Sequence, residues 1–84
     1  MPYIKKTDRK EFNDILNNLD YFNLDAGKIN YLVSSILKKF VSVHGENYSI
    51  YNEIIGALEC IKLEMYRRNV ASYEDNKIGE NGDI

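Results

Sequence analysis

The chain has 84 residues, a length that fits one domain and leaves no room for a second hydrophobic core. Its 11 basic and 13 acidic side chains nearly balance, so the basic excess expected of a general nucleic-acid binder is missing, and duplex nucleic acid is not an expected partner. Cys60 is the only cysteine and His44 the only histidine, which excludes an intrachain disulfide and disfavours a metal site. Small chains without these devices often gain stability by association, so we expect a homo-oligomer.

The sequence carries no recognisable targeting or membrane segment. Lys5 and Lys6 lie near the start, but no apolar run follows them, so this part is not a signal peptide. No apolar stretch approaches the roughly 20 residues that span a bilayer. A single cysteine fits a reducing compartment. We therefore expect a soluble cytoplasmic protein that does not contact membranes.

An extended arm over residues 1–7 precedes the first predicted helix, over residues 8–22. Pro2 lacks an amide hydrogen and favours the extended arm. Asp8 followed by Glu11 has the spacing of a helix start with an acidic first turn. The apolar positions recur at steps of three and four residues and form one stripe, which consists of Phe12, Ile15, Leu16, Leu19 and Phe22.

The second predicted helix, over residues 25–44, has the clearest periodicity in the chain. Asp25 is its expected N-cap, and Gly45 its expected terminator, because glycine adopts the left-handed conformation that closes many helices. Lys38 and Lys39 lie toward its end, where cations complement the helix dipole. Its apolar positions are Ile29, Leu32, Val33, Ile36, Leu37, Phe40 and Val41.

The third predicted helix, over residues 49–73, begins at Ser49 as the expected cap. Its main apolar stripe comprises Ile50, Ile54, Ala57, Leu58, Ile61 and Met65. Gly56, Cys60 and Leu63 add a second flank, where the small residues let another helix approach closely. Either this helix contacts both others in a three-helix bundle, or the second flank contacts another subunit, and the two explanations are compatible.

Residues 74–84 are predicted to form a polar tail. Helical periodicity stops at Glu74, and Asn81 with Gly82 forms a strong turn dipeptide. An alternative is that the third helix continues through Ala71 to Lys77. The predicted fold is therefore an all-α three-helix bundle with an extended N-terminal arm and a polar C-terminal tail.

Catalysis is not expected. Cys60 lies within an apolar helix face, where a cysteine behaves as a small hydrophobe, and His44 lies at a helix end. Glu59 and Glu64 are five residues apart and so lie on different faces of their helix. The scattered glycines form no phosphate-binding loop. We expect a protein that is not an enzyme and that uses no cofactor.

Binding chemistry is the more promising interpretation. Seven tyrosines are a high number for this length, and a tyrosine ring can stack on a base while a nearby cation pairs with phosphate. The candidate ligand-binding residues are Tyr66, Arg67, Arg68, Tyr73 and Lys77, with Tyr3 and Arg9 from the N-terminal part. The alternative is structural, since arginines suit the end of a helix and Glu64 with Arg68 is a favourable pair.

The C-terminal third also carries a family resemblance. The pattern reads Glu59-Cys60-x-Lys62-x-Glu64-x-Tyr66-Arg67-Arg68, followed by Tyr73-Glu74-Asp75-x-Lys77-Ile78-x-Glu80-Asn81-Gly82-Asp83. It resembles a family of small uncharacterised proteins of phages and bacteria, and the similarity covers nearly the whole chain. By analogy of size and helical form, the chain is also similar to phage sponge proteins, which sequester the cyclic nucleotide signals of bacterial anti-phage defence.

Two hypotheses follow. The resemblance to sponges implies a non-catalytic homo-oligomer that binds a cyclic oligonucleotide at subunit interfaces within the bacterial host cell. The other hypothesis is a helical protein–protein interaction module whose C-terminal tail docks on a partner, with Arg67 and Arg68 serving helix ends and subunit salt bridges.

Overall fold

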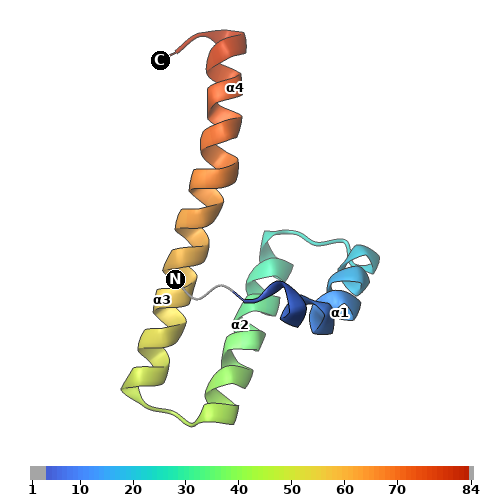
Figure 1. The fold of residues 1–84 in the computed structure, drawn as a ribbon, viewed down its shortest axis with the longest axis vertical. Helices are drawn as coiled ribbons and strands as arrows, with labels where there is room; N and C mark the ends of the chain where they lie inside the picture. Colours follow the sequence, from blue (N-terminus) through green and yellow to red (C-terminus); the bar gives the residue numbers. More distant parts are fainter. Residues whose placement is uncertain (1–3, 84) are drawn as a thin grey trace. The chain divides into compact units, whose positions relative to one another are not determined.

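The structure is a computed structural model that describes residues 4–83, and all regular secondary structure in this range is helical (Figure 1). The prediction of an all-α protein is thereby confirmed. The chain divides into two compact units, Met1–Val43 and His44–Ile84, which are described separately below.

The first unit opens with three short helical segments in place of the single α-helix predicted over residues 8–22. They are a 3₁₀-helix η1 (Lys6–Phe12), an α-helix α1 (Asn13–Asn18) and a 3₁₀-helix η2 (Leu19–Tyr21). The helix start predicted at Asp8 lies earlier in the structure, because η1 begins at Lys6 within the predicted arm, and the predicted acidic first turn is confirmed by Asp8. Asparagine and aspartate recur throughout this segment. Because their side chains compete with the backbone for hydrogen bonds, they favour short tight turns over one long helix.

Helix α2 (Ala26–His44) closes the first unit and lies close to its predicted bounds. Asp25 caps it as predicted, because its Oδ1 accepts a hydrogen bond from the amide of Lys28 at 2.8 Å. The Lys28 Nζ donates to the carbonyl of Asn23 at 2.8 Å and ties the preceding loop to the first turn. Gly45 follows the helix with φ of +89°, which confirms its predicted role as terminator.

The second unit begins with α3 (Tyr48–Met65). Asn47 caps this helix, because its Oδ1 accepts a hydrogen bond from the Ile50 amide at 3.0 Å, so the predicted cap at Ser49 is wrong. Asn47 has the extended backbone of a cap residue, whereas Ser49 already lies within the first turn. The Tyr51 hydroxyl donates to Glu46 Oε2 at 2.9 Å, and this bond raises the pKa of Tyr51.

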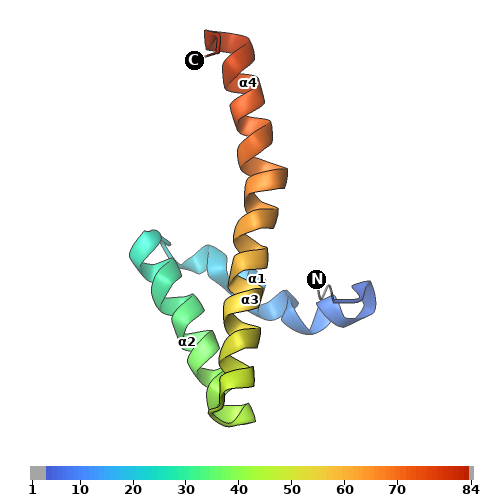
Figure 2. The same ribbon diagram turned by 90° about the vertical axis from the view of Figure 1, so that its left-hand side faces the viewer.

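The helix does not end at Met65. A π-helical turn, η3 (Tyr66–Val70), leads directly into α4 (Ala71–Asn81), so that the three elements follow one another as one helical rod in Figure 1 and Figure 2. The amide of Ala71 donates to the carbonyl of Tyr66, five residues earlier, as a π-turn requires.

The prediction of a polar tail from Glu74 onward is therefore wrong, since residues up to Asn81 are helical. The alternative, a helix that continues through Ala71 to Lys77, is confirmed. Extending an existing helix avoids the nucleation cost that a separate short helix would meet, so weak formers such as Asn76 and Gly79 are accommodated. The Asn81-Gly82 dipeptide ends the helix. Gly82 has φ of +83°, and its amide donates to the Ile78 carbonyl at 2.8 Å.

The π-turn changes which side chains share a face of the rod. Along α3, apolar positions alternate at steps of three and four residues, at Tyr51, Ile54, Leu58, Ile61 and Met65. An uninterrupted α-helix would continue this alternation at Arg68 and Ser72, three and seven residues beyond Met65. Because the π-turn holds one additional residue, Asn69 and Tyr73 take those places instead. The aromatic ring of Tyr73 thus continues the stripe of α3 into α4.

Burial is sparse. Within residues 4–83 the only side chain classed as buried is Ile54, which is 8% exposed. Ile50, Leu58 and Cys60 on α3 are half-buried, while Ile61 and Met65 of the predicted main stripe are exposed. A Cβ added at Gly56 would meet open space, so nothing in the described part of the chain uses the close approach that this glycine permits.

The two glycines of the C-terminal segment make a matched test of its helicity. Gly79 lies inside α4 with open space at its Cβ position, so Gly79→Ala should stabilise the helix by about 0.5–1 kcal/mol. Gly82→Ala should cost about 1–3 kcal/mol locally, because φ of +83° strains an L-residue. Amide hydrogen exchange over residues 71–82 measures both effects, and an unstructured tail would show neither.

Candidate functional site

Within the second unit, the residues predicted to bind a ligand fall into two groups. Tyr66, Arg67 and Arg68 belong to the π-turn, and Tyr73 and Lys77 to α4. Arg9 lies in η1 of the first unit. Tyr3 lies outside the described residues.

The two arginines share one carboxylate. Arg68 Nε lies 2.7 Å from Glu64 Oε2, and Arg67 Nη2 lies 3.1 Å from the same oxygen. The pair predicted between Glu64 and Arg68 is thus confirmed, with Arg67 added to it. The guanidinium groups remain mostly exposed, so each ion pair contributes less than about 1 kcal/mol to stability. An incoming phosphate would compete with Glu64 for both.

Tyr73 and Lys77 form a second group one turn apart on α4. The Lys77 Nζ lies 5.5 Å from the centroid of the Tyr73 ring and 3.2 Å from Glu80 Oε2. Cation–π contacts at exposed sites contribute about 0.5–1 kcal/mol. The ammonium group is therefore held between an aromatic face and a carboxylate.

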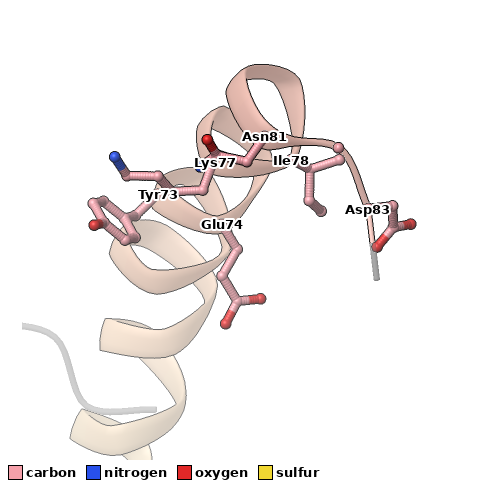
Figure 3. A pocket seen from close by; sticks show the side chains of 7 residues that line it. Tyr73, Glu74, Lys77, Ile78, Asn81 and Asp83 are labelled. Carbon is pink, nitrogen blue, oxygen red and sulfur yellow. The ribbon is translucent and has the colours of Figure 1, made fainter.

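A hollow of about 460 Å³ surrounds this second group at the end of α4 (Figure 3). Its lining consists of Tyr73, Glu74, Lys77, Ile78, Asn81, Gly82 and Asp83. In the close view, Tyr73 and Lys77 project to one side of the helix, while Ile78 and Asp83 lie to the other. Its volume lies within the roughly 300–1,000 Å³ of typical ligand sites. Tyr66, Arg67 and Arg68 do not line it.

Five of these lining residues were not among the predicted binding residues and fell in the predicted polar tail: Glu74, Ile78, Asn81, Gly82 and Asp83. The signal was present in the spacing of the sequence. Tyr73, Lys77 and Asn81 follow one another at four-residue steps, as do Glu74 and Ile78, so on a helix each set occupies one face.

The electrostatics of the hollow favour a cation. Glu74 and Asp83 contribute carboxylates, and the single lysine of the lining is engaged by Glu80. Ile78, whose side chain is 43% exposed, provides an apolar surface beside them. The arrangement suits a segment with basic and apolar side chains better than it suits a phosphate.

A second hollow, of about 340 Å³, lies in the first unit where the loop enters α2. It is lined by Phe22, Leu24, Gly27, Lys28, Tyr31 and Leu32. None of these residues was predicted from the sequence to bind a ligand. Its lining is mainly apolar, and Lys28 is already bound to the Asn23 carbonyl, so the polar groups that would orient a specific small ligand are few.

Two further features bear on the kind of site. Within residues 4–83, no three His, Cys, Asp or Glu side chains come together in a way that could hold a metal ion. No helix in the same range is long and apolar enough to cross a membrane.

Comparison with known proteins gives a family but no further relative. No curated protein and no solved structure matches the chain. The match to a protein family extends over residues 1–84, the whole of the sequence. The chain therefore belongs to the family described as Domain of unknown function (DUF6899).

Proposed function

We propose that the protein is a non-catalytic helical interaction module that docks a basic, partly apolar segment of a partner in the hollow on α4. The observation that supports this most directly is the composition of the hollow, which Glu74 and Asp83 line together with the apolar side chain of Ile78. Carboxylates around an apolar surface complement a segment that carries lysine or arginine beside an apolar side chain.

The isolation of α4 supports the same proposal. Among the described residues, the main contacts of α4 are with η3, the turn that precedes it. Tyr73 is 62% exposed and Ile78 43% exposed. A short helix takes most of its stability from packing an apolar face against a partner, so these side chains favour an occupant.

Self-association is part of the proposal. Large apolar side chains are exposed on both units, among them Phe12, Ile36 and Ile61. Soluble proteins rarely leave many such side chains in water unless they serve an interface. A helical bundle that is completed by copies of the chain accounts for them.

A cyclic-nucleotide sponge is the second candidate function. The exposed guanidinium groups of Arg67 and Arg68, next to Tyr66, favour it, because rings and arginines together can hold a nucleotide. Glu64 cancels part of their charge. Such a site would therefore need cations from more than one subunit.

A ligand titration separates the two functions. We expect a synthetic peptide with alternating lysine and leucine to raise the melting temperature, because a ligand at a hundredfold excess over its Kd adds about 2.7 kcal/mol. Ile78→Ser should abolish this shift, while Tyr21→Ser, at an 85% exposed position outside the hollow, should preserve it.

The opposite result identifies the sponge. If cyclic dinucleotides and not the cationic peptide stabilise the protein, and Arg67→Ala with Arg68→Ala removes that effect, the docking proposal is wrong. A shift from both ligand classes that survives Ile78→Ser would also contradict it, since the hollow would then not be the site.

A further inference from the structure

The chain itself contains a segment with the chemistry that the hollow favours. Residues 4–12 carry four basic side chains and two acidic ones, at Lys5, Lys6, Arg9 and Lys10 and at Asp8 and Glu11. All nine residues are exposed, and none of the four cations forms an ion pair within residues 4–83.

The 3₁₀ geometry of this segment sorts its charges by face. In a 3₁₀-helix, residues three apart lie above one another. In η1 this places Lys6, Arg9 and Phe12 in one row, and Asp8 and Glu11 in another. One face of η1 therefore presents two cations and an aromatic ring that is 41% exposed.

The C-terminal segment presents the opposite pattern. Residues 73–83 carry four acidic side chains against one lysine. Glu80 is paired with Lys77, whereas Glu74 and Asp75 form no ion pair among the described residues. On α4, Glu74 and Ile78 lie one turn apart, so a carboxylate stands next to an apolar side chain.

We propose that η1 of one copy docks on α4 of a second copy, with Phe12 in the hollow and Lys6 and Arg9 facing Glu74 and Asp75. This inference rests on the proposed docking function and names its partner. Both halves of the contact are present in every chain, so two copies can form it twice in a closed two-fold dimer. Opposite charges on the two surfaces give the contact its specificity and its orientation.

Charge reversal tests the pairing. The variant Lys6→Glu/Arg9→Glu and the variant Glu74→Lys/Asp75→Lys should each dimerise at least tenfold more weakly than the wild type. An equimolar mixture of the two should restore dimers, because the reversed surfaces complement each other. The control Lys38→Glu/Lys39→Glu makes the same change of charge on α2 and should dimerise like the wild type. Sedimentation equilibrium measures each constant, and far-UV circular dichroism verifies that the variants are folded.

Several results would overturn the inference. A wild-type protein that is monomeric at every concentration excludes it, as do reversed variants that dimerise normally or a mixture that does not recover. A chain carrying both reversals that stays monomeric while it regains wild-type stability would show that the contact forms within one molecule.

A peptide of residues 4–12 separates this inference from the function on which it rests. If that peptide fails to bind while the lysine–leucine peptide binds through Ile78, α4 is a docking site for another protein and the second-copy assignment is wrong. If neither binds, the docking function itself fails.

Discussion

Replacing Ile54 by alanine should lower the free energy of unfolding by about 2–5 kcal/mol, the cost of removing a buried branched side chain and leaving a cavity. Ile54 is 8% exposed and is the one buried side chain of residues 4–83. A domain of this size has a total stability of only about 5–10 kcal/mol. The single substitution should therefore remove a large part of the total stability, and the protein should melt at a much lower temperature.

The adjacent residue supplies the control. Ile55 has the same side chain but is 64% exposed, so Ile55→Ala should cost less than about 1 kcal/mol. Urea denaturation of both variants gives the difference in the midpoint at constant slope. Equal losses at the two positions would contradict the prediction, and they would show that the face of Ile55 is also buried in solution.

The regular parts of the fold were predictable because periodicity and capping agreed in them. Apolar spacing, the cap at Asp25 and the terminator at Gly45 all point to one helix, which the structure places at Ala26–His44. Where the local signals conflicted, the prediction was wrong. Asn47 and Ser49 are both good caps, and only the backbone conformation shows that Asn47 is used.

The C-terminal helix was not predictable from local propensity. Asn76 and Gly79 are weak helix formers, and Asn81 with Gly82 reads as a turn in isolation. The deciding factor is that α4 continues from η3, which removes the cost of nucleation. The π-turn could not be predicted for a related reason. A search for apolar residues with a period of 3.6 assumes a regular α-helix, so it does not allow for the one additional residue that a π-turn inserts.

At the candidate site, closeness in sequence likewise did not predict which side chains contact one another. Closeness in sequence grouped Tyr66, Arg67 and Arg68 with Tyr73 and Lys77, but the structure joins the arginines to Glu64 and Lys77 to the Tyr73 ring. Which of them bind a ligand stays a prediction. The acidic lining of the hollow could not be predicted, because it depends on the helical structure of residues 74–81, which were predicted to form a polar tail.

Replacing Asn76 by proline should unwind α4 and remove the docking hollow. Proline in a helix interior deletes one hydrogen bond and clashes with the carbonyl four residues earlier, at a cost of about 3 kcal/mol. Because the main contacts of α4 are with η3, the damage should stay local. We expect a smaller helical signal in circular dichroism, faster exchange of the amides after residue 76, and loss of peptide binding, with the unfolding of α3 unchanged.

Tyr48→Pro is the matched control, because it places the same residue where a helix tolerates it. Tyr48 is the first residue of α3, and Asn47 before it has φ of −160° and ψ of 170°, an extended conformation compatible with a following proline. This variant should retain helicity and peptide binding. If Asn76→Pro behaves like Tyr48→Pro, residues 74–81 are not helical in solution, and the hollow on which both the docking function and the second-copy contact depend does not exist there.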